Sequence, residues 1–224
     1  MAKNVDEKLQ DANSLKETTT KYQAEMAEVG VNNELSTDFN NRIQNVTAKD
    51  TAYKESINLI RQKTVEQNNA LQQSRTAIRI VKDAGMDVYY GQPDIIAEFH
   101  PGITINTVKA MLSELPYFIE LTIRRMEKLS EAGIGQPHAD ELSRCYSLVQ
   151  TSDSEQENAK RMRNTAKNEL KGALTNLQEI MYRIRKKAAV RFAGSPDIRN
   201  EFRTIIVRRR KRAEETGGEM GNTE

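Results

Sequence analysis

The chain has 224 residues, of which 29% are charged and 5% aromatic, with no tryptophan, a composition that suits long solvated helices better than a thick globular core. Its N-terminal residues lack the apolar core of a signal peptide, and no run of about 18 apolar residues could span a membrane. A single cysteine, Cys145, excludes an internal disulfide and fits a reducing compartment. We therefore expect a cytoplasmic protein with no membrane span.

The first predicted helix covers residues 4 to about 29. Its apolar residues recur at steps of three and four, as on one face of a helix. They are Val5, Leu9, Ala12, Leu15, Tyr22, Met26 and Val29. Gly30 is expected to end the helix, because glycine accepts the left-handed conformation just beyond a helix at little cost.

A longer helix is predicted from residue 39 to residue 88. Its apolar residues keep a heptad spacing, which is typical of a coiled-coil seam. One heptad position holds Phe39, Val46, Tyr53, Ile60, Val81 and Val88, and the other holds Ile43, Ile57, Leu71 and Ile78. Asp50, Gln67 and Ser74 interrupt the seam with polar side chains, and a weak break at Asp50 is an open alternative.

The long helix is followed by the motif G-Q-P-D-I-I-A-E-F at residues 91–99. Pro93 suits the first turn of a short helix, where no amide donor is needed, and Asp94 suits the positive end of the helix dipole. Ile95 and Phe99 then form one apolar face that packs back onto the bundle. A structural role is favoured over acid–base chemistry, which needs paired carboxylates in different environments.

The motif returns at residues 194–202 as G-S-P-D-I-R-N-E-F, identical at six of nine positions. The same offset of 103, without a gap, aligns Gly30 with Gly133. We therefore predict an all-α protein with an internally duplicated helical unit, forming an elongated bundle with long coiled-coil-like helices. The two repeats are predicted at residues 1–102 and 103–212, packed together or strung end to end, and residues 213–224 are predicted to be a disordered tail.

Two features distinguish the second repeat. Pro116 lies within its first helix, predicted from about residue 106 to 132, and favours a kink or break near Leu115. In its long helix the apolar set shifts to Ala159, Met162, Ala166, Leu170, Ala173, Leu177 and Ile184. A break at 150–153 stays open there, because Ser152-Asp153-Ser154-Glu155 resembles a helix start.

The charge is unevenly distributed along the chain. Residues 158–212 carry 17 basic and 4 acidic side chains, a net of +13, and the rest of the chain carries a net of −11. The densest cluster is Arg208, Arg209, Arg210, Lys211 and Arg212, and upstream of it lie Arg183, Arg185, Lys186, Lys187 and Arg191. Five adjacent cations suit phosphates, an acidic protein face or an anionic membrane surface. Few aromatic side chains accompany them, so any contact with nucleic acid is expected to be with the backbone only. The alternative is a solvated face that balances the acidic first half.

No pattern in the sequence predicts a catalytic, cofactor or metal site. A metal site needs several ligands at fixed spacing, and neither His100 nor His138 has a histidine or cysteine within one helical turn. Cys145 has no histidine in helical register, so an unreactive thiol is favoured over a nucleophile. We expect a non-enzymatic protein without a cofactor.

Two functions fit these observations. The first is a structural or scaffolding protein that assembles with itself, as a homo-oligomer, or with protein partners, since seams with polar interruptions leave apolar edges for a neighbour to cover. The alternative is a protein that binds nucleic acid or another polyanion through Arg208–Arg212.

Overall fold

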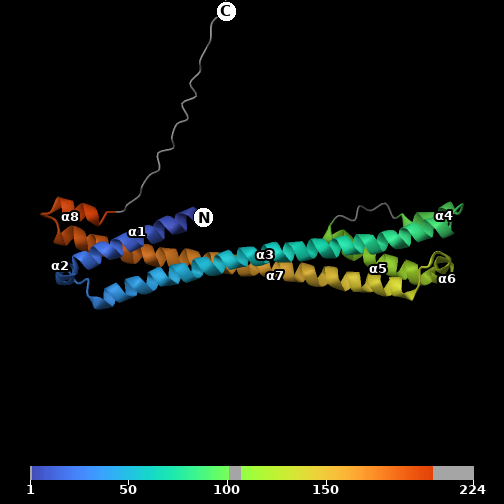
Figure 1. The fold of residues 1–224 in the computed structure, drawn as a ribbon, viewed down its shortest axis with the longest axis horizontal. Coiled ribbons are helices and arrows are strands. Elements are labelled where there is room, and N and C mark those ends of the chain that lie inside the picture. The colour runs from blue at the N-terminus through green and yellow to red at the C-terminus, as the bar shows by residue number, and fades with distance from the viewer. Residues whose placement is uncertain (1, 101–106, 204–224) are drawn as a thin grey trace, which may run out of the picture. The chain divides into compact units, whose positions relative to one another are not determined.

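A computed structural model describes residues 2–100 and 107–203, with side chains from Val5 onward. All regular structure in these ranges is helical and no strand occurs in them (Figure 1), so the prediction of an all-α fold is confirmed. No helix within the same ranges is long and apolar enough to cross a membrane. The tail predicted at 213–224 lies outside the described residues.

The first helix expected from the sequence is divided in two. Helix α1 spans Ala2–Lys21 and α2 spans Gln23–Glu28, with Tyr22 between them at φ −111° and ψ 35°. Tyr22 is held outside helical geometry by tertiary contacts, because its ring packs against Phe192 and Phe202 at centroid distances of 5.4 and 5.9 Å. The expectation of a single uninterrupted helix was therefore wrong at this residue.

Gly30 ends α2 as predicted, with φ at 76°. Its amide donates to the carbonyl of Ala27 and the amide of Val31 donates to that of Met26, both at 2.9 Å. This pair of bonds satisfies carbonyl groups that the end of the helix would otherwise leave open.

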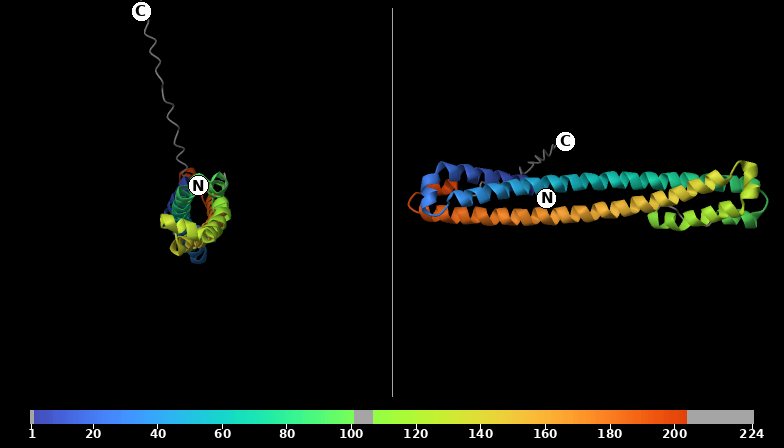
Figure 2. Two further views of the ribbon diagram at one scale, coloured as in Figure 1. Left: turned by 90° about the vertical axis from the view of Figure 1, so that its right-hand side faces the viewer. Right: turned by 90° about the horizontal axis from the view of Figure 1, so that it is seen from below.

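Two long helices run through the molecule. Helix α3 spans Asn33–Val88 and α7 spans Gln136–Arg191, each with 56 residues, and they lie side by side (Figures 1 and 2). Neither is broken at Asp50 or at 150–153, which settles the two open alternatives. The polar residues there are satisfied within the helices: Asp50 pairs with Lys54 at 2.6 Å and Ser152 Oγ donates to the Val149 carbonyl at 3.0 Å.

The proline motifs that follow the long helices begin short helices, as predicted. Helix α4 spans Pro93–Ile96 and continues as the 3-10 helix η1, Ala97–Phe99, and α8 spans Pro196–Glu201. Each proline stands in the first turn, where its missing amide donor costs no hydrogen bond.

Helix α5 spans Val108–Arg124 and passes through Pro116. Of the kink or break expected near Leu115, the break was therefore wrong, and the kink stays a prediction. Leu115 and Phe118, on either side of the proline, are fully buried, and this packing offsets the hydrogen bond that the proline removes. The chain leaves the helix at Arg125 and continues as α6, Met126–Leu129, and η2, Ser130–Ala132. The helix start expected at about residue 106 lies outside the described residues.

The chain divides into two compact units. Of the described residues, unit 1 comprises 2–48 and 172–203, and unit 2 comprises 49–100 and 107–171. These boundaries do not follow the predicted repeats, since each unit draws on both of them and the chain passes from one unit to the other within α3 and within α7. The predicted boundary between residues 102 and 103 separates two sequence repeats and not two compact units, and it stays a prediction.

Unit 1 packs α1, α2 and α8 around the first part of α3 and the last part of α7. Its buried apolar side chains include Leu15, Met26, Phe39, Leu177, Ile180 and Ile184. Arg185 of α7 links two of the other elements, because its Nη2 donates to Asp11 of α1 at 2.7 Å and its Nε donates to the Phe202 carbonyl at 2.9 Å.

Unit 2 packs α4, η1, α5 and α6 against the last part of α3 and the first part of α7. Its core cluster contains Ile78, Val81, Phe99, Met111, Phe118, Leu121, Leu129, Leu142 and Val149. The ring of Phe99 lies directly on Gly85 of α3, where a Cβ would come within 2.5 Å of ring carbons. Glycine at this position allows η1 to pack closely on the long helix.

Candidate interaction surfaces

The cationic cluster predicted as a polyanion site, Arg208, Arg209, Arg210, Lys211 and Arg212, lies outside the described residues. It therefore stays a prediction. The basic residues upstream of it are on the described part of α7, and the structure places each of them.

Three of these five upstream cations stabilise unit 1 internally. Arg185 is bound to Asp11, Lys187 Nζ donates to the Val29 carbonyl at 2.6 Å, and Arg191 pairs with Glu28 at 3.0 Å. Arg183 is exposed and forms no salt bridge with any described residue, and Lys186 lies over the Tyr182 ring at 5.0 Å. Most of the positive charge on this part of α7 is thus used within the protein.

A polar hollow of about 360 Å³ lies where the turn after α2 meets the start of α3. It is lined by Gly30, Asn32, Glu34, Leu35, Asp38, Arg183 and Lys187. Its two acidic and two basic side chains balance, and Lys187 is already bound to a backbone carbonyl. This hollow has no net charge to attract a polyanion.

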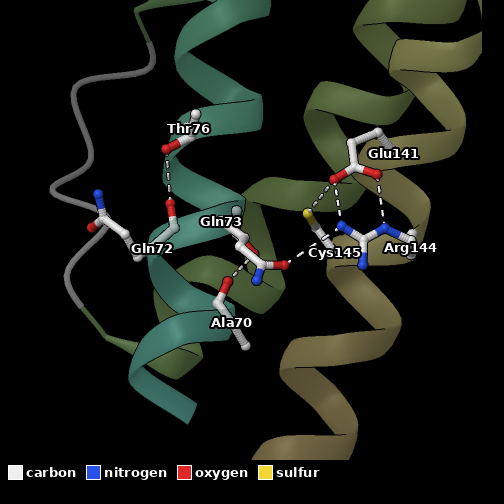
Figure 3. A network of polar contacts seen from close by, with 8 residues as sticks. Ala70, Gln72, Gln73, Thr76, Glu141, Arg144 and Cys145 are labelled. Carbon is white, nitrogen blue, oxygen red and sulfur yellow. Dashed lines mark hydrogen bonds and ion pairs between the residues drawn. The ribbon is translucent and has the colours of Figure 1, made fainter. Parts of the chain in front are cut away.

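Cys145 of α7 belongs to a polar network in unit 2 (Figure 3). Its Sγ lies 3.8 Å from Glu141 Oε1, and the Glu141 carboxylate accepts bonds from Arg144 at 2.6 and 2.7 Å. Burial, and then the negative charge of Glu141, raise the pKa of the Cys145 thiol, while the bond from Arg144 lowers the pKa of Glu141. The arrangement favours a protonated thiol, and a nucleophile would need the opposite shift.

We expect Cys145 to resist alkylation in the folded protein. Iodoacetamide at pH 8 should modify it much more slowly than in urea, because only the thiolate reacts and this thiol is both buried and held protonated. The rate can be followed by mass spectrometry. As a control, Ser147→Cys in a Cys145→Ser background places a thiol on an exposed position of the same helix. Equal rates for the two thiols would contradict the expectation.

The two histidines have local roles. His138 Nδ1 accepts the Gly135 amide at 3.2 Å, and His100 Nε2 lies 2.9 Å from Met86 Sδ. Within residues 2–100 and 107–203, no group of three or more histidine, cysteine, aspartate or glutamate side chains could hold a metal ion.

The glutamate of each proline motif binds side chains of another helix in its own unit. In unit 2, Glu98 accepts from Arg125 at 2.8 Å and from Arg124 at 3.1 Å. In unit 1, Glu201 accepts from Lys21 at 2.8 Å and from the Tyr22 hydroxyl at 3.1 Å. These bonds, from Arg125 and Lys21 above all, lower the pKa of each carboxyl group. The motif therefore serves to anchor a short helix onto the bundle.

The lowered pKa of Glu98 predicts a pH-dependent loss of stability. Its folded-state pKa lies below its unfolded value of about 4.3, so the ionised carboxylate stabilises the fold fully above that pH, and this contribution is lost as the pH falls through the folded pKa. Glu98→Gln should cost about 1–2 kcal/mol of unfolding free energy at pH 7 and clearly less at pH 3. Urea titrations at both pH values measure the difference.

Glu127→Gln is the matched control for this pH dependence. Glu127 is exposed and its carboxylate forms no salt bridge with a described residue. Its substitution should leave the unfolding free energy nearly unchanged at both pH values. If Glu98→Gln cost the same at pH 3 as at pH 7, the role of the ionised carboxylate would be refuted.

In one stretch of unit 2, the described residues belong to α3 and α7 alone. The core cluster draws residues from α3 only from Ala70 onward and from α7 only up to Val149, and α5 lies beside that end of the pair (Figure 2). Further along, the buried side chains between the two helices are largely polar: Asp50, Ser56, Gln67, Ser152 and Gln156. Gln67 Nε2 donates to Asp153 at 2.9 Å and Gln156 Nε2 to Thr64 at 3.2 Å. These bonds fix the register but bury little apolar surface.

A groove of about 620 Å³ follows this two-helix stretch, and we call it the α3–α7 groove. It is lined by Ala52, Glu55, Ser56, Leu59, Asn158, Arg161, Met162, Thr165, Ala166 and Glu169. Met162 is 58% exposed, so its expected place in the core was wrong. Ala159 and Leu170 on the same helix are buried, because they face α3 whereas Met162 faces the groove. In the sequence, the only sign of this groove is that polar residues interrupt the heptad seam of α3.

No protein-family model, no curated protein and no solved structure matches this chain.

Proposed function

We propose that this protein is a non-enzymatic structural or scaffolding component that assembles with itself or with protein partners. The observation that carries the proposal is the two-helix stretch of α3 and α7. Its internal contacts are largely polar, while Leu59, Met162 and Ala166 line an open groove. Helices gain most of their stability from packing an apolar face against another element, so this stretch is suited to a partner that covers it.

We also propose that the two halves of the chain are copies of one helical unit. Several features support this at the offset of 103 that relates the two motifs. Helices α3 and α7 have equal length, and both their ends differ by this offset. Gly30 and Gly133 have φ values of 76° and 77°. Glu98 is bound by residues 124 and 125, and Glu201 by the corresponding residues 21 and 22.

Sedimentation velocity over a wide range of protein concentration tests the proposed assembly. We expect a mass above that of the single 25.5 kDa chain, rising with concentration. A protein that stays monomeric at the highest concentration, and retains no partner on affinity capture, would contradict the proposed function. A single protonated thiol is compatible with assembly in a reducing compartment such as the cytoplasm.

The second candidate function is polyanion binding, favoured by the net charge of +13 over residues 158–212. If binding depends on phosphate contacts alone, the binding constant should fall as the salt concentration rises. On duplex DNA, its logarithm should fall with the logarithm of the salt concentration with a slope of about −0.9 per phosphate neutralised. Changing Arg208, Arg209, Arg210, Lys211 and Arg212 to serine should then abolish binding to DNA, RNA and heparin. If the parent binds none of them at low salt, this function is excluded.

A further inference from the structure

The α3–α7 groove carries charges of opposite sign on its two rims, and the described residues form no salt bridge with either of them. Glu55 stands on α3 and Arg161 on α7, and neither forms a salt bridge with another residue of the described ranges. Other charged residues nearby are paired across the helices: Lys49 with Glu169 and Lys63 with Glu155, both at 2.8 Å. The rims therefore keep one acid and one base available to a partner.

The paired residues also give the level of each rim charge along the helices. The pairs Lys49–Glu169 and Lys63–Glu155 show which residues of the two antiparallel helices lie opposite each other. Glu55 follows residue 49 by six positions, so it lies opposite residue 163 of α7, six positions before residue 169. Arg161 is two residues from that level, or about 3 Å along a helix that rises about 1.5 Å per residue. The two rim charges thus lie at nearly the same height on opposite sides of the groove.

This placement is self-complementary under a twofold rotation. An axis parallel to the helices would lay α3 of one chain over α7 of a second chain and keep every residue at its level. Glu55 of each chain would then face Arg161 of the other, twice across the interface, as an isologous contact requires. Leu59 and Met162 would be enclosed between the layers, which turns a two-helix stretch into a four-helix one with an apolar centre.

We propose that the α3–α7 groove binds the same groove of a second copy of this chain, with Glu55 and Arg161 forming reciprocal ion pairs around Leu59 and Met162. The proposal rests on the proposed function and names its partner and surface. Apolar burial supplies the affinity, and the paired charges fix the register and exclude other alignments.

Charge reversal tests the proposal by measuring the dimer dissociation constant with sedimentation equilibrium. Glu55→Arg and Arg161→Glu each place like charges opposite one another twice, and each should weaken the dimer about tenfold or more. The double variant Glu55→Arg/Arg161→Glu restores opposite charges and should bring the constant back near that of the parent. Met162→Lys, which puts a charge into the groove itself, should also weaken the dimer.

Arg79→Glu is the matched control. It is the same charge reversal at an exposed position of α3 outside the groove, and it should leave the dissociation constant unchanged. Circular dichroism on all variants checks that the helices remain folded. An assembly that neither single reversal weakens would overturn the groove interface and leave the proposed function standing. A parent that is strictly monomeric would overturn the interface directly, and affinity capture would then decide the proposed function separately.

Discussion

Replacing Arg185 by methionine is expected to lower the unfolding free energy by about 3 kcal/mol. The guanidinium bridges α7 to Asp11 of α1 and to the Phe202 carbonyl beyond α8. The side chains of Arg185 and Asp11 are 22% and 14% exposed. Removing the arginine takes this 2.7 Å ion pair from a largely buried carboxylate and the hydrogen bond from the Phe202 carbonyl. Breaking a buried pair by removing one partner costs more than the ion pair itself contributes.

Urea denaturation measures the loss, and hydrogen exchange locates it. Exchange should accelerate in the amides of α1 more than in those of α5, because Asp11 lies on α1. Arg185→Lys keeps the charge but cannot bridge both acceptors, so its cost should be intermediate. Arg183→Met is the control. Arg183 lies two residues away, is exposed and forms no salt bridge with a described residue. The unfolding free energy of this variant should stay within about 0.5 kcal/mol of that of the parent. Equal costs at positions 183 and 185 would contradict the bridging role.

Replacing Gly85 by alanine is expected to destabilise the protein by up to about 2 kcal/mol, although alanine is the better helix former. The new methyl group would meet the Phe99 ring at 2.5 Å, and Phe99 is completely buried. Overpacking of this kind costs about 1–3 kcal/mol. The gain from removing a glycine inside a helix, about 1 kcal/mol, offsets part of it. Thermal and urea denaturation measure the net effect.

Gly172→Ala is the same substitution in the interior of the other long helix. No atom lies within 4 Å of the Cβ it would add, so only the helix propensity changes. It should stabilise the protein by about 0.5–1 kcal/mol. Opposite signs at the two glycines are the expected result, and a stabilising effect at Gly85 would show that η1 can move away from α3.

Helices α1 and α2 of unit 1, and α5 and α6 of unit 2, have features that residues close in the sequence do not predict. Apolar spacing placed helices at residues 4–29 and about 106–132, and Gly30 and Gly133 end them in the left-handed conformation. The interruption at Tyr22 depends on Phe192 and Phe202, which are distant in the sequence. Pro116 is tolerated in α5 because Leu115 and Phe118 are packed on both sides of it. The residues that pack on Tyr22, and the burial of Leu115 and Phe118, cannot be deduced from the residues next to them in the sequence.

Which side chains lie free on the candidate surfaces depends on tertiary structure even more than the helix boundaries do. The sequence identified the basic residues of α7 but could not tell that Arg185, Lys187 and Arg191 bind groups of unit 1. Their partners lie in α1, at the end of α2 and in the turn after it. It placed Met162 in the core by its spacing from Ala159 and Ala166. Which of these residues faces α3 depends on the rotation of α7 about its own axis, and a spacing near the helical period fits more than one rotation.

The sequence by itself determined the all-α class, the long helices and the short helices that begin at Pro93 and Pro196. These follow from side-chain periodicity and from backbone preferences, both of which act within a few residues. Only the tertiary structure decided that the helices pass unbroken through Asp50 and Ser152, that each compact unit draws on both halves of the chain, and that Leu59 and Met162 line a groove. Burial and pairing between distant segments outweigh local preferences of about 1 kcal/mol per residue, so such features can be known only once those segments are in contact.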